Sequence, residues 1–283
     1  MRLRELRRRC RETLILAGAA RPEYSADLII SRRLGIGRAE LLYKDDEIPA
    51  QSCEGIFAAA ARRAQGVPLA YVLHEAEFYG YRFKVGRGVL IPRPETELLV
   101  EAALEYFPRG RGARFADWCT GSGCIAVTLA RLIPGARVTA VDISEKALSI
   151  ARENARRLDA EVDFRQGDAL GELFPGQREQ FDLIVSNPPY IPRREKASMR
   201  VNVTGYEPAE ALFVEDDDPL IFYRAIARNA RRLLRPGGRL YFEIHENFAD
   251  ETLRMLTREG FPDTAVRRDL NDKNRMTCSL QRR

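Results

Sequence analysis

Apolar residues near the start of the chain recur at the spacing of one helix face. The positions that share this face are Leu3, Leu6, Cys10, Leu14 and Ala17. The pattern over residues 1–65 predicts a small helical bundle, with one helix to about Ala17, a second opened by Pro22, and a short third around Glu40. A fourth helix ends at Gly66 and Pro68.

Between residues 71 and 100 the pattern changes from helical to alternating. Phe78 and Phe83 flank a Tyr79-Gly80 turn, which predicts a β-hairpin between two domains. Pro94 stands where a further helix begins, and acidic residues occupy the first turn of that helix.

From Ala113 onward, short apolar runs alternate with amphipathic segments. The runs predict strands at 113–118, 137–141, 161–165, 181–186 and 239–244, and the segments predict helices at 122–132, 144–158, 219–234 and 247–259. This alternation is typical of a doubly wound, Rossmann-like α/β sheet. The last segments, 264–269 and 275–280, predict a terminal antiparallel hairpin at the sheet edge.

The composition allows two globular domains. The chain has 283 residues, of which 45% are apolar and 31% are charged. Residues 1–63 hold 13 Lys or Arg and 9 Asp or Glu, so they carry +4 of the net charge of +5. Such a bias suits an acidic or ribonucleoprotein partner, although a solvated helix surface has the same composition.

The cysteine pattern indicates a reducing environment. Five cysteines form no CxxC pair and have no cluster of histidines beside them, so we expect reduced thiols, a cytoplasmic location and no metal site. Arginines precede an apolar patch at 14–20, but the helical spacing favours an amphipathic helix over a signal peptide. No stretch reaches transmembrane length, so we expect no membrane partner.

The apolar run 181–186 ends abruptly in the tetrad Asn187, Pro188, Pro189 and Tyr190. The run predicts a buried parallel strand, whose carboxyl end is where such sheets bind ligands. The prolines stiffen the loop and remove N–H donors. The Asn187 side-chain oxygen and the Pro188 carbonyl can accept both hydrogens of a planar amino group, on which Tyr190 can stack. An Asn-Pro turn without a chemical role is the alternative.

A turn after the first strand of the predicted sheet consists of Cys119, Thr120, Gly121, Ser122 and Gly123. Its glycines allow close backbone approach to a ligand at a helix N-terminus. The second strand ends at Asp142, which is placed for ribose hydroxyls, and the third ends at Asp168, which is placed for an adenine amino group. A helix N-terminal acid and a turn aspartate are the respective alternatives. The turn lacks the third glycine of GxGxxG, which favours a nucleoside without phosphates, such as S-adenosylmethionine.

Several segments together resemble one known family. They are RRAQGVPLAYVL at 62–73, EFYG at 77–80, VLIPRPETELLV at 89–100, the turn at 119–123, VSNPPYIP at 185–192 and YEP at 206–208. The chain resembles the class I S-adenosylmethionine-dependent methyltransferases and, within them, the release-factor glutamine methyltransferases, or HemK-like family. NPPY alone is shared with methyltransferases of adenine or guanine amino groups, so the 62–100 block is the discriminating part.

The resemblance implies a helical substrate-recognition domain over 1–70, a β-hairpin linker over 71–92, and a seven-stranded methyltransferase domain over 93–283. It implies methyl transfer from S-adenosylmethionine to the side-chain amide nitrogen (N5) of the glutamine in the GGQ motif of peptide chain release factors. The product of the cofactor would be S-adenosylhomocysteine. The resemblance implies no metal, membrane or nucleic-acid partner, and we expect a monomer.

The resemblance also assigns residues. The cofactor would contact Cys119, Thr120, Gly121, Ser122, Gly123, Asp142, Asp168, Ala169 and Asn187. The glutamine amide would contact Asn187, Pro188, Pro189 and Tyr190, of which Asn187, Pro188 and Tyr190 would be catalytic. Cys119 stands in place of the first glycine usual in the turn, and Ala169 stands where some relatives carry an aromatic residue. We expect cofactor binding to survive the change at Cys119, whereas aromatic stacking at Ala169 is either lost or supplied by another residue.

Some roles stay open at this level. Arg93 could form an ion pair with Glu95 or Glu97, or contact the substrate. His245 follows the fifth predicted strand and could line a cleft or be a hydrogen-bonded structural histidine. Two other functions are also compatible with parts of the pattern: methylation of an exocyclic amine of DNA or RNA, and a catalytically silent module that binds the ribosome or a release factor.

Overall fold

The structure is a computed structural model that describes residues 1–107, 112–178 and 180–282. It divides the chain into two units, one of residues 1–75 with 200–206 and one of residues 76–199 with 207–283. The domain boundaries expected after residues 70 and 92 stay predictions. Across the described residues, every helix is too short or too polar to cross a membrane.

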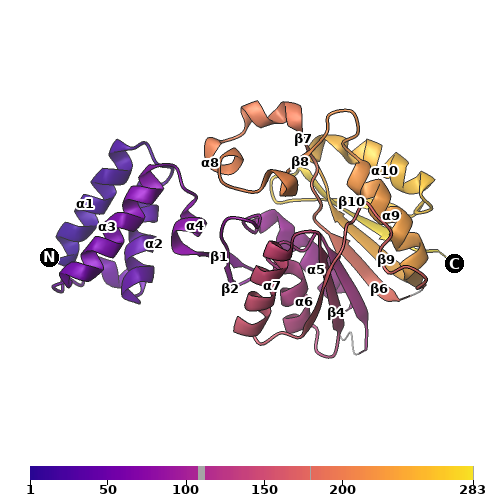
Figure 1. The fold of residues 1–283 in the computed structure, drawn as a ribbon, viewed down its shortest axis with the longest axis horizontal. Helices are drawn as coiled ribbons and strands as arrows, with labels where there is room; N and C mark the ends of the chain where they lie inside the picture. The colour runs from indigo at the N-terminus through magenta and orange to yellow at the C-terminus, as the bar shows by residue number, and fades with distance from the viewer. Residues whose placement is uncertain (108–111, 179, 283) are drawn as a thin grey trace. The chain divides into compact units, whose positions relative to one another are not determined.

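The first unit is a helical bundle (Figure 1). Its elements are α1 (Leu3–Leu16), α2 (Pro22–Leu34), the 3₁₀ helix η1 (Arg38–Leu42), α3 (Ala50–Ala64), α4 (Leu69–Leu73) and, farther along the chain, α8 (Val201–Thr204). Leu3, Leu6, Cys10 and Leu14 are buried in its core, as the helical spacing predicts. Ala17 is an exception, because it follows the end of α1 and is exposed.

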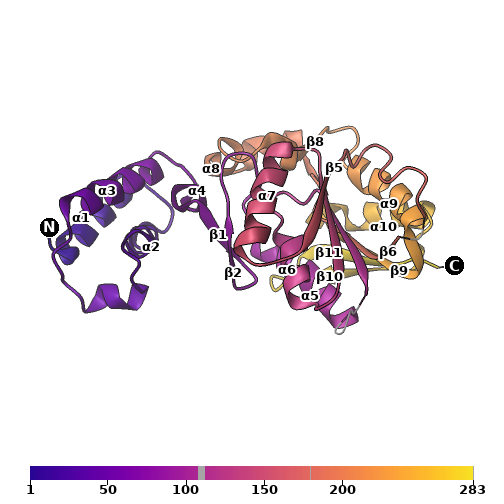
Figure 2. The same ribbon diagram turned by 60° about the horizontal axis from the view of Figure 1, so that its bottom comes forward.

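A seven-stranded sheet forms the centre of the second unit (Figure 2). Its strands are β3 (Arg114–Trp118), β4 (Arg137–Asp142), β5 (Val162–Gln166), β6 (Phe181–Ser186), β9 (Leu234–Glu243), β10 (Thr264–Arg268) and β11 (Asn274–Leu280). The order is β10-β11-β9-β6-β3-β4-β5. β11 is antiparallel to both of its neighbours, β10 and β9, and the other neighbouring strands are parallel. The predicted α/β sheet and its terminal hairpin are confirmed. β9 begins earlier than expected, because Leu234 already pairs with Phe181 of β6.

Side chains of the central strands alternate between two apolar layers. Leu183 and Val185 of β6 pack with α5 (Glu97–Tyr106), α6 (Cys124–Leu132) and α7 (Glu145–Arg157), whereas Ile184 packs with α9 (Ile221–Leu233) and α10 (Ala249–Arg258). Figure 2 shows α6 and α7 on one side of the strands and α9 and α10 on the other. Because both faces are covered, the strands are continuous apolar runs.

Outside the large sheet, the second unit also contains a β-hairpin, a 3₁₀ turn before α5, and a pair of two-residue strands. The hairpin pairs β1 (Glu75–Phe78) with β2 (Tyr81–Lys84). Tyr79 and Gly80 both have positive φ, as a two-residue hairpin turn requires, so the predicted turn is confirmed. The 3₁₀ turn η2 (Pro94–Thr96) precedes α5, where a helix start was predicted. The parallel pair of β7 (Ile191–Pro192) and β8 (Phe213–Val214) was not predicted, because two-residue strands leave no periodic signal.

Candidate active site

The carboxyl ends of β3, β4, β5 and β6 open onto one pocket of the second unit. The predicted site residues that line it are Cys119, Gly121, Asp142, Asp168, Ala169, Asn187 and Pro189. The predicted residues outside its lining are Thr120, Ser122, Gly123, Pro188 and Tyr190. The structure therefore brings residues from four separate strand ends to one place, as expected of a parallel sheet.

Asp117 in β3 holds the turn that follows that strand. Its Oδ2 accepts hydrogen bonds from Thr120 Oγ1 at 2.5 Å and from the Ala126 N–H at 3.2 Å. The two glycines then serve different purposes. A Cβ on Gly123 would lie 3.0 Å from the Ala151 Cβ, so Gly123 allows α6 and α7 to pack closely, whereas Gly121 faces open space. Of these two glycines, Gly121 lines the pocket and Gly123 does not.

Cys119 adopts a left-handed backbone conformation with φ of 61°. This conformation explains why glycine is usual at that position, because L side chains are strained there. The Cys119 side chain packs against the apolar layer on the α9 face. Burial raises the pKa of the Cys119 thiol far above its ordinary value, so the side chain is a neutral wall of the pocket.

Asp142 is fixed by the backbone on two sides. Its Oδ2 accepts the Gly121 N–H at 2.8 Å and its Oδ1 accepts the Ser144 N–H at 2.9 Å. Burial raises the pKa of Asp142, and these N–H donors oppose the shift. Each carboxylate oxygen retains lone-pair capacity for a ligand hydroxyl. The side chain is thus a rigid acceptor at the pocket wall.

The end of β5 supplies a mixed polar and apolar wall. Asp168 Oδ1 accepts the Leu170 N–H at 2.8 Å, which is the bond of a turn aspartate, and Asp168 also lines the pocket. Ile143 and Leu170, which the sequence analysis missed, line the same pocket with 59% and 42% of their surface exposed. Ile143 directly follows Asp142, and Leu170 lies two residues after Asp168. Their position just after an acid at a strand end is the sequence signal that could have identified them.

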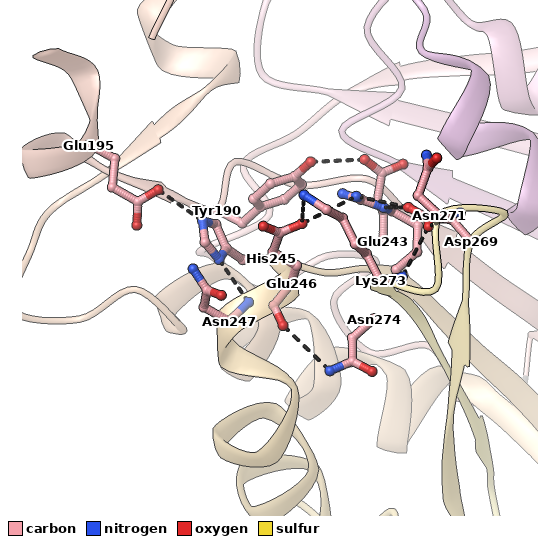
Figure 3. Close-up of polar contacts among 11 residues, drawn as sticks. Tyr190, Glu195, Glu243, His245, Glu246, Asn247, Asp269, Asn271, Lys273 and Asn274 are labelled. Carbon is pink, nitrogen blue, oxygen red and sulfur yellow. Dashed lines mark hydrogen bonds and ion pairs between the residues drawn. The ribbon is translucent and has the colours of Figure 1, made fainter. Parts of the chain in front are cut away.

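The tetrad after β6 is held by two side chains from other elements. Asn187 Nδ2 donates a 3.2 Å hydrogen bond to Thr96 Oγ1. The Tyr190 hydroxyl donates a 2.9 Å bond to Glu243 Oε1 (Figure 3). Burial and the Glu243 carboxylate raise the pKa of Tyr190 well above 10, so the phenol stays protonated. The Tyr190 ring is therefore anchored at its hydroxyl end.

Glu243 and Thr96 are site residues that the sequence analysis missed. Each is 2% exposed, and Thr96 Oγ1 donates to Glu243 Oε2 at 2.6 Å. Burial raises the pKa of Glu243, and the hydrogen bonds from Thr96 and Tyr190 oppose this shift. Glu243 is the last residue of β9. It thus occupies the strand-end position that drew attention to Asp142, and the same signal could have identified it.

Arg93 and His245 have partners that the sequence did not indicate. Arg93 Nη2 binds Glu207 Oε1 at 2.6 Å, and Glu207 Oε2 also accepts the Ile91 N–H. Of the two alternatives for Arg93, the ion pair with Glu95 or Glu97 is therefore wrong. Glu207 belongs to the YEP segment. His245 Nε2 contacts Glu195 Oε2 at 3.1 Å, and its Nδ1 accepts the Asn247 N–H, which makes it a hydrogen-bonded structural histidine beside the Tyr190 ring (Figure 3).

The charge of the pocket is acidic. Asp142, Asp168 and Glu210 line it, and none of the described lining residues is Lys or Arg. A pyrophosphate would meet carboxylates there without a cationic side chain. The pocket therefore suits a neutral or positively charged ligand with polar hydroxyls and a flat apolar part.

Solved structures share the fold at low identity. A methyltransferase from Pyrococcus furiosus aligns over 83% of this chain and 100% of its own, with a TM-score of 0.52 and 17% identity. The 16S rRNA N2 G1207 methyltransferase of T. thermophilus, solved with AdoMet and guanosine, aligns over 74% of this chain and 50% of its own, with a TM-score of 0.53 and 22% identity. These likenesses concern the fold alone.

Sequence comparison gives the family. A model described as a methyltransferase domain matches residues 110–279, and one described as the PrmC N-terminal domain matches residues 5–73. The release factor glutamine methyltransferase of Bacteroides thetaiotaomicron is 47% identical over 216 residues, which is 76% of each chain. That of Chlorobaculum tepidum is 43% identical over 271 residues, 92% of this chain and 91% of its own. With its pocket, its tetrad and both matched regions, the chain belongs to the release factor glutamine methyltransferase family.

Proposed function

We propose that this chain transfers a methyl group from S-adenosylmethionine to the side-chain amide nitrogen N5 of the glutamine in the GGQ motif of peptide chain release factors. One observation carries the proposal: Asn187 lines the same pocket as Asp142 and Asp168. The Asn187 side chain, which can accept hydrogen bonds from an amide, thus lies in the same pocket as two carboxylates that can bind a nucleoside. The arrangement joins a cofactor site to a site for a planar amino group.

The residues of the pocket fit S-adenosylmethionine. Asp142 has acceptor capacity for the ribose hydroxyls, and Asp168 is the acceptor for the adenine amino group. Ile143 and Leu170 present apolar surface to the adenine ring, and the open space at Gly121 admits the amino-acid end of the cofactor. The acidic lining matches the positive charge of the ligand, and the missing aromatic at Ala169 is offset by this apolar surface.

The tetrad would hold the glutamine amide. Asn187 Oδ1 and the Pro188 carbonyl each accept one N–H of the amide, and the Tyr190 ring provides a flat surface beside it. Two accepted hydrogens fix the plane of the nitrogen and turn its lone pair toward the cofactor. Because an amide nitrogen is a poor nucleophile, this positioning contributes most of the rate.

For methyl transfer, the protein needs mainly to orient the amide nitrogen toward the methyl group and to exclude water from the reacting atoms. S-adenosylmethionine supplies an electrophilic methyl on a positively charged sulfur. The amide nitrogen gains the methyl and releases one proton to water, so a strong base is not required. The buried prolines and the apolar wall limit water at the reacting nitrogen, which favours a step that neutralises charge.

The release factor would be recognised by residues 1–70 and the hairpin at 71–92. Exposed apolar side chains in the first unit support this role, notably Leu16, Leu42 and Tyr43 at 89%, 71% and 68% exposure. The proposal includes a monomeric enzyme that requires no nucleic acid. It also includes a cytoplasmic location, which is supported by the free thiols of the five cysteines.

The test is mass spectrometry of a recombinant release factor after incubation with this protein and S-adenosylmethionine. Peptide mapping across GGQ is expected to show one added methyl on the glutamine. A release factor with that glutamine changed to alanine is the control and should gain none. A protein that binds the cofactor but leaves GGQ unmodified would contradict the proposal, and methyl-labelled RNA and DNA would then be examined.

A further inference from the structure

Four buried or half-buried side chains form a continuous hydrogen-bonded series beside the pocket. Asn187 Nδ2 lies 3.2 Å from Thr96 Oγ1, and Thr96 Oγ1 lies 2.6 Å from Glu243 Oε2. Tyr190 bonds the other oxygen of Glu243 at 2.9 Å (Figure 3). Thr96 and Glu243 are each 2% exposed, so water does not compete for these bonds.

With Glu243 ionised, the donors in this series point in one direction. A carboxylate has acceptor sites and no hydrogen, so its two oxygens accept from Thr96 and Tyr190. Thr96 has a single hydroxyl hydrogen, and the short bond to Glu243 uses it. Thr96 therefore has only lone pairs to offer Asn187. The side of the Asn187 amide that faces Thr96 must be the NH₂ group.

The direction matters because the amide group of asparagine has two ends of similar shape and opposite polarity. With Nδ2 held by Thr96, the carbonyl oxygen Oδ1 is the end left for the pocket that Asn187 lines. In the reverse orientation Oδ1 would face the lone pairs of Thr96 Oγ1. Two acceptors would then lie against each other in a buried site, which is unfavourable.

We propose that Thr96 and Glu243 are positioning residues that lock the orientation of the Asn187 amide, and that this lock makes the site select an N–H donor, glutamine, over a carboxylate, glutamate. The inference rests on the proposed function. It assigns the choice between amide and acid to a pair of side chains that do not contact the substrate. Asn187 presents its Oδ1 acceptor to the pocket because Glu243, through Thr96, holds the Nδ2 end of the amide on the other side.

Thr96 can be tested by a pair of variants. Thr96→Val has nearly the same shape without the hydroxyl, and Thr96→Ser keeps the hydroxyl. Transfer to the release factor is expected to fall about tenfold or more in kcat/KM for Thr96→Val, as expected for a lost buried hydrogen bond. Thr96→Ser should restore most of it. The dissociation constant of S-adenosylmethionine and the thermal unfolding midpoint should stay close to those of the unchanged protein.

Glu243→Gln tests the direction of the series. A glutamine there can accept from Tyr190 through Oε1 and donate to Thr96 through Nε2, so Thr96 becomes free to donate to Asn187 Oδ1. The Asn187 NH₂ group would then face the pocket. The probe is a release factor whose GGQ glutamine is changed to glutamate, used as a competitor. Glu243→Gln should lose transfer activity and bind this competitor more tightly, relative to the glutamine form, by about tenfold.

The control is Glu195→Gln, which alters the contact to His245 and leaves the series intact. It should match the unchanged protein in both measurements. If Glu243→Gln keeps the original preference for glutamine, or Thr96→Ser is as impaired as Thr96→Val, the lock is refuted. If Thr96→Val does not fold, the preference of Glu243→Gln decides. Failure of the unchanged protein to modify GGQ would instead refute the proposed function, which separates the two ideas.

Discussion

The backbone N–H of Gly121 donates a 2.8 Å hydrogen bond to Asp142 Oδ2, which ties the turn after β3 to the end of β4. The carboxylate therefore has two tasks. It holds the turn after β3 in place, and in the proposed function it also accepts hydrogen bonds from the cofactor. A substitution at Asp142 removes both.

Asp142→Ala is expected to weaken S-adenosylmethionine binding by about 1–3 kcal/mol, because the ribose hydroxyls lose their acceptor. Isothermal titration calorimetry measures this change directly. Asp163→Ala, an exposed acid on the neighbouring strand β5, is the control and should bind as the unchanged protein does. An affinity unaffected by Asp142→Ala would remove this residue from the cofactor site.

Asn187→Ala is expected to abolish methyl transfer and to leave cofactor affinity nearly unchanged. In the proposed function, the side chain supplies an acceptor for the substrate amide, and its loss leaves the amide without orientation. Transfer is measured with labelled S-adenosylmethionine and a release factor, and affinity by calorimetry. Equal loss of activity and affinity would show that Asn187 serves the cofactor site instead.

Asp117 should make stability depend on pH. Burial raises the pKa of Asp117 to about 7 from 3.8, because the ionised form is poorly solvated. Between these values the folded state holds a proton that the unfolded state has lost. The free energy of unfolding should therefore fall as pH rises from about 4 to about 7, by up to about 1.4 kcal/mol per pH unit from this group.

The measurement for Asp117 is denaturant unfolding of the unchanged protein and of Asp117→Asn across that pH range. Other titrating groups cancel in the difference between the two proteins. The free energy of unfolding of the unchanged protein, relative to that of Asp117→Asn, should decrease as pH rises toward 7 and then become constant. A difference that does not vary with pH would mean that Asp117 is ionised throughout.

The left-handed backbone at Cys119 predicts a graded response to substitution. Cys119→Val should lower the free energy of unfolding by about 2 kcal/mol, because a β-branched side chain is most strained at positive φ. Cys119→Gly should lower the free energy of unfolding by less, because glycine relieves the backbone strain and this offsets the lost side-chain packing. Thermal unfolding of both variants compares them, and a valine variant as stable as the glycine variant would contradict the interpretation.

Strands and turns of the second unit could be predicted because their signals are local. The run at 181–186 holds three consecutive apolar residues, Leu183 to Val185, and both faces of β6 are covered. The positive φ of Gly121 and Gly123 follows from the turn between a strand and a helix. Such features depend on neighbouring residues, so the sequence carries them in one place.

Contacts between distant segments could not be predicted in the same way. The sequence offered Arg93 only nearby acids as ion-pair partners, but its partner Glu207 is 114 residues away. Thr96 and Glu243 are 147 residues apart. Their contact depends on which strand ends the sheet order brings together. Short-range spacing therefore identified the tetrad and missed the side chains that hold it.

Three carboxylates line the pocket, with neither Lys nor Arg among its described lining residues, so the pocket attracts a positively charged ligand more than a neutral one. S-adenosylhomocysteine lacks the sulfonium charge of S-adenosylmethionine. In the proposed function, Asp142, Asp168 and Glu210 would therefore attract the product less than the reactant. Loss of the charge on methyl transfer would favour exchange of the by-product for a new cofactor.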